Sequence, residues 1–382
     1  MRELTAEQAR AVRLRSLRLV ADRQAPPAPV PADAVVELVT WLGALQGQDM
    51  HSLLWSLGVR LPGSTVTGLR AALEQGGVLR TWPMRGTLHL VPSRDARWML
   101  QLMAPRTSRA EITRRSQLGL TEADTDRAVD LLGGALAGGV RLTRAECLDR
   151  LAAAGITVAG QAGYHLLGAA CRRGVACLAP DVGREQTFVL LDDWAPQQCA
   201  LDREEALAEI AVRFVRSHGP VGRRDLAGWT GLTLTDVDRG LAAMGPALQP
   251  VVVDGVELVA WAPSLDRDDA ADRDDAADSG GCLVLPGFDE FVLGYKDRSL
   301  QLNAAHWPAI VPGGNGVFRP TLVRAGRVMG TWRRTVGRRT VVVEAVPFEP
   351  PAAGDRAAFE RALARYGAYL EQDAVEVRWQ DG

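Results

Sequence analysis

The stretch VLRTWPMRGTLHLV, from Val78 to Val91, alternates apolar and polar residues and turns in the manner of a β-hairpin. Gly76-Gly77 comes directly before it, and paired glycines are typical of a helix end. Further upstream, apolar residues recur at helical spacing over 8–21, 32–45 and 66–75. Short helices followed by a two-stranded hairpin predict a winged-helix unit.

The same plan recurs twice along the chain. We expect helices at 122–137, 143–154 and 161–173 with strands at 175–179 and 186–191. Thr143 and Glu146 have the spacing of a capping box at the start of the second of these helices. A third set has helices at 203–217, 222–228 and 235–243 and strands at 251–253 and 257–261 around the turn Asp254-Gly255. Such units either place a helix in the DNA major groove or act as protein-interaction modules, and three in one chain favour DNA.

The predicted fold class is therefore α+β, mainly helical, with tandem winged-helix units. The predicted domains are a first winged helix at 1–115, a second at 116–200 and a third at 201–265. An acidic, disordered loop is expected at 266–281, because its alanine-rich Asp/Arg repeat cannot bury a core. The remaining residues, 282–382, alternate strand patterns with one long helix and predict a C-terminal α/β region.

Composition excludes several classes of protein. The 382 residues are enough for two or three domains, and no apolar run has the length of a membrane span. The N-terminus lacks the apolar core of a signal peptide, so we expect a cytoplasmic protein at the nucleoid, without a membrane partner. The five cysteines are not spaced as C-x-x-C, which predicts buried thiols rather than a zinc site or disulfides. No cofactor-binding fingerprint is present, and we expect neither metal nor cofactor.

The net charge of −2 hides an uneven distribution. The acidic repeat at 266–278 holds seven aspartates and two arginines, a net of −5, which leaves +3 for the rest of the chain. Between Arg298 and Val343 there are eight arginines and no acidic residue, and Lys296 is the only lysine in the sequence. Arginine favours bidentate contacts with phosphate. A codon bias in a GC-rich genome explains the same excess, and the composition does not choose between the two.

Two neutral amides, Gln46 and Gln48, follow the helical pattern at 32–45 and are separated by Gly47. An amide side chain can donate and accept hydrogen bonds but does not exchange a proton at neutral pH. The pair is either a solvated helix end or a site that orients water or a base. Asp49 is a rival as general base, but we favour it as the cap of a helix that continues through 51–57.

With these motifs in place, the sequence resembles the winged-helix DNA glycosylases of the AlkZ and YcaQ type over nearly its whole length. The resemblance implies a C-shaped protein with a concave DNA-binding face that releases N7-alkylated guanine, including bulky or crosslinked adducts. It also implies that Gln46 and Gln48 are catalytic, although Gly47 departs from the larger aliphatic residue of the AlkZ motif. The resemblance rests on LQGQ at 45–48, LRTWPMRGTLH at 79–89, FDE at 288–290, LGYKDR at 293–298 and GTWRR at 330–334.

Alkylation at N7 makes guanine cationic, so the base leaves as a neutral group and needs no general acid. One glutamine carbonyl would then face the developing charge on the sugar while the other amide positions water. We expect a monofunctional enzyme, because a Schiff-base amine is limited to Lys296 and the N-terminus. A monomer acting on double-stranded DNA with alkylated guanine is the expected assembly. The alternative function is a non-catalytic winged-helix DNA binder or transcriptional regulator.

The candidate DNA-binding residues come from the first hairpin and from arginine-rich segments. Each candidate has a structural alternative. For the tryptophan and the histidine of the hairpin, the alternative is burial within the protein. For the arginines, it is a surface position without a DNA contact. The candidates are Trp82, Arg85, His89, Arg106, Arg109, Arg114, Arg115, Arg333 and Arg334, with Arg338 and Arg339 beside the last two.

Overall fold

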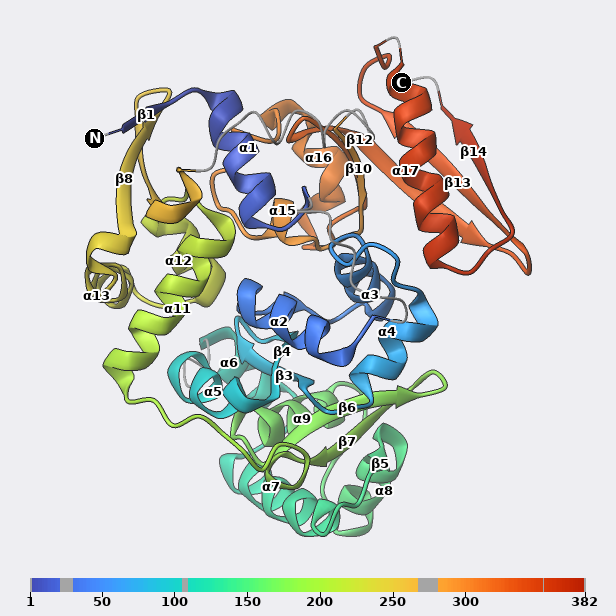
Figure 1. Ribbon diagram of the computed structural model, residues 1–382. Helices are drawn as coiled ribbons and strands as arrows, with labels where there is room; N and C mark the ends of the chain where they lie inside the picture. The colour runs from blue at the N-terminus through green and yellow to red at the C-terminus, as the bar shows by residue number, and fades with distance from the viewer. Residues whose placement is uncertain (1, 21–29, 105–108, 267–280, 353, 381–382) are drawn as a thin grey trace.

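The computed structural model describes residues 2–20, 30–104, 109–266, 281–352 and 354–380, without the side chains of 109–112. Most of the acidic segment expected to be disordered, 267–280, lies outside these residues, as does Arg106. Helices and strands alternate along the described chain, and the strands form three sheets (Figure 1).

The first part of the chain contains the predicted helices and hairpin, with two corrections. The helix expected at 8–21 is α1, which runs from Ala6 to Ser16. The helix expected at 32–45 ends at Leu42, because Gly43 adopts φ 83° and its N–H closes the last turn on the Val39 carbonyl. Leu45 and Gln46 instead form a two-residue strand. The elements are β1 (Arg2–Leu4), α1 (Ala6–Ser16), α2 (Ala32–Leu42), β2 (Leu45–Gln46), α3 (Met50–Gly58), α4 (Val66–Leu73), β3 (Val78–Met84), β4 (Thr87–Pro92), η1 (Ser93–Asp95), α5 (Ala96–Met103) and α6 (Arg109–Gln117).

The second part follows the predicted order, and its hairpin joins the first one. Thr143 and Glu146 form the expected capping box at the start of α8. Arg80 pairs with Leu90 on one side and with Leu178 on the other, so both hairpins belong to one six-stranded sheet of order β2-β4-β3-β6-β7-β5. The elements are α7 (Glu122–Leu136), β5 (Leu142–Thr143), α8 (Arg144–Ala153), α9 (Ala162–Arg172), β6 (Ala176–Val182), β7 (Glu185–Leu190) and α10 (Leu191–Trp194).

The third part ends in a hairpin whose turn, Asp254-Gly255, has positive φ at both residues, 48° and 78°, as a tight two-residue turn requires. Its first strand also pairs in parallel with β1, so the start of the chain completes a three-stranded sheet that the sequence pattern did not predict. The elements are α11 (Arg203–His218), α12 (Arg223–Thr230), α13 (Leu234–Ala243), η2 (Gly245–Ala247), β8 (Leu248–Val253), β9 (Val256–Trp261) and η3 (Ala262–Ser264).

The C-terminal part is a five-stranded sheet of order β10-β11-β12-β13-β14 with α17 packed against it. Figure 1 places this sheet at one end of the molecule and α7 and α8 at the other, with α2 and α3 between them. The elements are β10 (Cys282–Leu285), α15 (Glu290–Leu293), η4 (Ala304–His306), α16 (Trp307–Ile310), η5 (Pro312–Gly314), β11 (Thr321–Arg324), β12 (Arg327–Val336), β13 (Thr340–Pro347), α17 (Asp355–Tyr369) and β14 (Ala374–Trp379).

One large apolar core connects the C-terminal sheet with the first and third parts of the chain. Trp55 of α3 lies between Tyr366 and Tyr369 of α17, with ring centres 4.8 and 4.7 Å away, and donates its indole N–H to the Val284 carbonyl at 2.8 Å. Because α3 starts at Met50, two residues after Gln48, this packing anchors the helix that follows the amide pair. Within the described residues, no helix combines the length and apolarity needed to cross a bilayer.

A buried ion pair reinforces this contact. Arg60, just after α3, meets both carboxylate oxygens of Asp289 at 2.7 and 2.9 Å, and Ser56 donates to the same carboxylate at 2.5 Å. The side chains of the pair are 0% and 1% exposed. Burial alone would raise the pKa of Asp289, but Arg60, Ser56 and the Phe291 N–H together hold it below its usual value.

We therefore expect Asp289→Asn to lower the free energy of unfolding by about 3–5 kcal/mol, because it leaves the buried Arg60 charge without its carboxylate. Urea denaturation measures this difference. The exposed pair Arg223–Asp238 provides the control, since Asp238→Asn there should cost about 1 kcal/mol or less. Equal losses in the two variants would contradict the role given to the buried pair.

Candidate active site

The amide pair lies at the edge of the six-stranded sheet rather than at a helix end. Within the described residues, strand β2 pairs with β4 alone, through Leu45 with Leu90 and Gln46 with His89. Gln46 is half-buried and Gln48 is exposed, and the Gln46 Nε2 group donates to the Gln48 Oε1 atom at 3.3 Å. The Oε1 atom of Gln46 is buried and has no hydrogen-bond partner among the described residues. The two amides therefore form one unit, with Gln48 on the solvent side.

Asp49 is engaged as a helix cap. Its carboxylate accepts the backbone N–H groups of His51 at 2.8 Å and Ser52 at 3.3 Å, and the Ser52 hydroxyl at 3.2 Å. These bonds satisfy N–H groups that the first turn of α3 leaves without partners. The structure thus confirms the favoured interpretation of Asp49 as a helix cap. Because Gln48 directly precedes Asp49, the same bonds fix the direction in which the chain enters the helix.

His89 lies beside Gln46 on the neighbouring strand, but it is fully buried. Its Nδ1 atom is 2.9 Å from the Thr87 carbonyl and must carry a hydrogen to bond it, so its Nε2 atom accepts from the Arg85 Nη2 group at 3.2 Å. Burial, followed by the charge of Arg85, lowers the pKa of His89 to about 3. His89 is therefore a neutral acceptor that orients Arg85, and its burial argues against the expected direct contact with DNA.

Arg85 stands at the tip of the first hairpin. Arg85 and Gly86 have φ of 55° and 67°, and Met84 pairs with Thr87, so the two residues form a tight two-residue turn. A Cβ on Gly231, at the C-terminal end of α12, would lie 3.8 Å from the Arg85 Cγ atom, so the two surfaces are in contact. Although the residue as a whole is exposed, burial lowers the pKa of the guanidinium group, and the Glu290 charge opposes this shift. The turn thus presents Arg85 between the hairpin and the third part of the chain.

Trp82 does not reach the surface. It is 4% exposed, belongs to the core of the second part, and donates its indole N–H to the Tyr164 hydroxyl at 3.3 Å. The expected wedge into DNA does not fit this position. Tyr164 of α9 is the exposed aromatic residue of the pair, at 37%.

The C-terminal sheet brings a second cation to the start of α3. Arg334 of β12 lies over the Tyr366 ring, with its guanidinium carbon 5.9 Å from the ring centre. Burial has the largest effect in lowering the pKa of His51, and the positive charge of Arg334 lowers it further, whereas the negative charge of Asp49 raises it. Among the described residues no carboxylate lies within 4.0 Å of Arg334. An arginine without a carboxylate partner therefore lies near the first turn of α3.

The other predicted arginines lie elsewhere and most have partners. Arg333 meets Glu344 of the neighbouring strand at 2.5 Å, and Arg115 meets Glu122 at 3.1 Å. Arg114 is exposed and donates to Gln161 at 2.8 Å, a neutral acceptor that leaves its charge free. Arg106 and the side chain of Arg109 lie outside the described residues.

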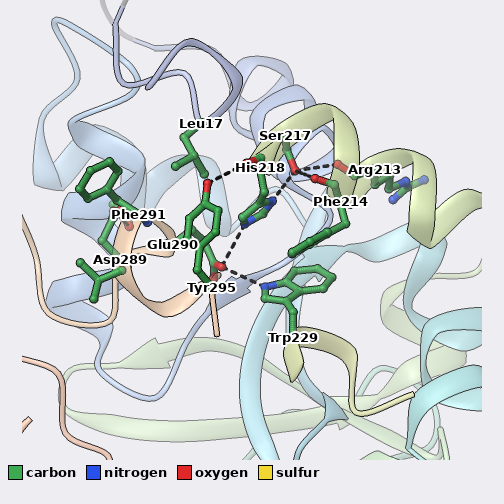
Figure 2. A network of polar contacts seen from close by, with 12 residues as sticks. Leu17, Arg213, Phe214, Ser217, His218, Trp229, Asp289, Glu290, Phe291 and Tyr295 are labelled. Atoms are coloured by element: carbon green, nitrogen blue, oxygen red, sulfur yellow. Dashed lines mark hydrogen bonds and ion pairs between the residues drawn. The ribbon is translucent and has the colours of Figure 1, made fainter. Parts of the chain in front are cut away.

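Several charged residues around the site were not assigned from the sequence. Glu290 accepts from the Trp229 indole at 2.9 Å and lies 3.3 Å from His218 Nε2, and Ser217 lies 2.7 Å from His218 Nδ1 (Figure 2). Tyr295 donates to the His218 carbonyl at 2.8 Å. Ser217, His218 and Glu290 are linked by hydrogen bonds in the arrangement serine–histidine–acid, as in a hydrolytic triad. All three are 0% exposed, so no substrate reaches them.

This network connects α11, α12 and α15 behind the site. Trp229 also packs against the turn before β2, where a Cβ on Gly43 would lie 3.4 Å from its ring. One sequence feature pointed to this network, the charged pair Asp289-Glu290 shortly after an apolar strand. The partners of that pair are more than 60 residues away, and spacing alone could not identify them.

The low pKa of His89 has a consequence for stability. In the unfolded chain His89 binds a proton below its ordinary pKa of 6.5, whereas in the folded protein it stays neutral down to about 3. The folded state therefore loses stability as pH falls from 6.5 towards 3. We expect His89→Gln to flatten this dependence by up to about 1.4 kcal/mol per pH unit between about pH 4 and pH 6. Urea titrations of both proteins at several pH values measure the slopes, and parallel slopes would contradict the assignment.

Comparisons with known proteins agree with this arrangement. The family model described as DNA glycosylase AlkZ-like matches residues 39–369, which include Gln46, Gln48 and Arg334. The chain is 28% identical over 268 residues to a protein of Streptomyces sahachiroi named "Interstrand DNA cross-link repair glycosylase", covering 67% of this chain and 70% of that protein. It is also similar in fold to the solved structure of Streptomyces sahachiroi DNA glycosylase AlkZ, with a TM-score of 0.77 and 22% identity over 99% of this chain and 100% of the other.

The family match covers most of the chain, and the amide pair, the capped helix and the hairpin all lie inside it. An enzyme is therefore favoured over the alternative of a non-catalytic regulator. The chain belongs to the AlkZ-like DNA glycosylase family, and it is a DNA glycosylase.

Proposed function

We propose that the protein hydrolyses the N-glycosidic bond of N7-alkylated guanine in double-stranded DNA. The observation that carries the proposal is the hydrogen-bonded amide pair, Gln46 with Gln48, at an edge strand with Gln48 exposed. The carboxylate nearest in sequence, Asp49, is already bonded to three donors of α3. A site built on neutral amides suits a base that needs no proton in order to leave.

The different exposure of Gln46 and Gln48 indicates a different role for each. N7-alkylguanine carries a positive charge and departs as a neutral base, so catalysis must stabilise the oxocarbenium-like sugar and place water. Gln48, on the solvent side, contacts the sugar or the water, while Gln46 donates to Gln48 and fixes its orientation. The enzyme is monofunctional, because the side chain of Lys296, the only lysine, packs against Gly228 of α12 rather than beside the amides.

The substrate range extends to bulky adducts and interstrand crosslinks. Support comes from the Streptomyces sahachiroi relative, whose name assigns it to interstrand crosslink repair. The position of the amides also supports it, because an edge strand leaves one side of the pair free of further strands. Self-resistance to a DNA-alkylating metabolite is a fitting biological setting.

The arrangement of the chain is proposed to be three winged-helix units, 1–115, 116–200 and 201–265, followed by the C-terminal α/β region. Each unit has helices followed by a hairpin, β3–β4, β6–β7 and β8–β9. The units would form a C whose concave face binds one DNA duplex, with Arg85 and Arg334 on either side of the amides. The protein would act as a monomer.

We expect Gln48→Ala to lower the rate of N7-methylguanine release by about 100-fold or more, since a group that orients the reacting water is lost. Gln46→Ala should have a smaller or equal effect, because Gln48 loses only its orienting donor. Single-turnover excision from a methylated oligonucleotide at saturating enzyme measures both rates.

The matched control is Gln75→Ala, which removes an exposed glutamine just after α4 and should keep the wild-type rate. Wild-type rates in both active-site variants would reject the assignment. Absence of excision by the wild-type protein on a panel of N7-alkylguanine oligonucleotides would reject the substrate class.

Arg334→Ala should weaken binding to undamaged duplex DNA and reduce the dependence of log Kd on log salt by about one unit, because one phosphate contact is lost. The neighbouring Arg333→Ala provides the comparison, since Arg333 is already neutralised by Glu344 and should change the salt dependence less. Fluorescence anisotropy at several salt concentrations measures both. Equal salt dependence in the two variants would contradict the choice of Arg334.

A further inference from the structure

The backbone at Gly47, between the two glutamines, lies against the side chain of Arg80. Gly47 is buried, and its N–H donates to the Leu88 carbonyl at 2.7 Å. Its φ lies outside the left-handed region, so backbone conformation alone does not require glycine here. A Cβ at this position would lie 3.4 Å from Arg80 Cδ and 3.4 Å from the Leu90 nitrogen. Alanine therefore fits, whereas a longer side chain would have to displace Arg80.

Arg80 is held there by the second hairpin. It sits on β3, is 4% exposed, and forms an ion pair through Nη2 with Asp181 of β6. The two side chains are only 5% and 13% exposed. Burial lowers the pKa of Arg80, and the charge and hydrogen bond of Asp181 oppose this shift. Because a buried guanidinium without a carboxylate is costly, Asp181 fixes the Arg80 side chain under Gly47.

We propose that Arg80 and Asp181 are positioning residues for the excision reaction. The methylene groups of Arg80 fill the space into which a larger residue at position 47 would point, and so they support the segment that carries Gln46 and Gln48. Asp181 comes from the second hairpin, so this hairpin acts on the catalytic segment through one ion pair. The inference rests on the proposed function of the amide pair.

The competing explanation is purely structural. Arg80 pairs with both Leu90 and Leu178, so the ion pair could simply tie β3 to β6. A structural tie predicts lower stability with an unchanged excision rate in the folded enzyme. A positioning role predicts a slower chemical step at unchanged DNA affinity, because small displacements of reacting groups have large effects on rate.

The first experiment uses Asp181→Asn, which removes the charge and keeps the volume. Single-turnover release of N7-methylguanine at saturating enzyme should slow by about tenfold or more, with the Kd for the same DNA within about twofold of wild type. The control is Asp355→Asn, which breaks the Arg324–Asp355 pair of the C-terminal part. The Asp355 side chain is 6% exposed, and this pair supplies none of the three atoms nearest to Gly43 or to Gly47. It should lower Tm and leave the rate unchanged.

The second experiment tests the contact itself by a double-mutant cycle. Gly47→Leu should slow release more than Gly47→Ala, because the alanine Cβ would lie at an ordinary contact distance of 3.4 Å from Arg80 Cδ whereas the leucine reaches further. R80A alone should also slow release, because the support under Gly47 is lost. G47L should slow release less in the R80A background than in the wild type, because the leucine then gains the space left by the arginine. This cycle remains decisive if Asp181→Asn does not fold.

An Asp181→Asn enzyme that folds and reacts at the wild-type rate would overturn the proposal, as would an equal loss of rate from G47L in the wild-type and R80A backgrounds. A wild-type protein that releases no alkylated base would instead reject the proposed function.

Discussion

The antiparallel pairing of β2 with β4 is the constraint on which the site depends. Only two residues of β2 take part, Leu45 and Gln46, yet they determine which side chains face one another. Successive residues of a strand point to opposite faces, so the pairing buries Leu45 in the core and places Gln46 beside His89. A shift of one residue would exchange these faces. The Gly43 turn before β2 and the Asp49 cap after Gln48 prevent such a shift by fixing both ends of the segment.

Buried ion pairs between arginine and aspartate connect distant parts of the chain. Arg60 joins α3 to Asp289, Arg80 joins the first hairpin to Asp181, and Arg213 joins α11 to Asp95. Each of these charges is buried with a carboxylate partner, and each pair spans residues more than 100 positions apart. Arg85 and Arg334 differ, since neither has a carboxylate within 4.0 Å among the described residues. This contrast separates the arginines that join distant elements from Arg85 and Arg334, whose contact with phosphate is the role proposed above.

Local patterns predicted most of the fold, whereas long-range pairing was beyond them. The hairpin at 78–91, the capping box at Thr143 and the turn at Asp254-Gly255 depend on residues close in sequence, and all three are present. The parallel pairing of β1 with β8 and the union of two hairpins in one sheet depend on tertiary contacts that leave no periodic signal. For the candidate site, the sequence motif predicted the amide pair, and its catalytic role stays a prediction. The burial of Trp82 and His89 was left open, because an alternating strand does not reveal which face is covered from outside.

The groups around the amide pair explain why a candidate site without a proton donor is consistent with the release of an alkylated base. Asp49 has its carboxylate directed to the N–H groups of α3, and His89 is neutral because burial and Arg85 hold its pKa near 3. The Asp49 carboxylate is thus committed to a helix, and His89 has no proton to give beyond its bond to Thr87. Such a site gives little help to a neutral base, whose departure requires protonation. A base already made cationic by alkylation has no such requirement, and it is the kind of leaving group that fixed dipoles and an oriented water suffice to release.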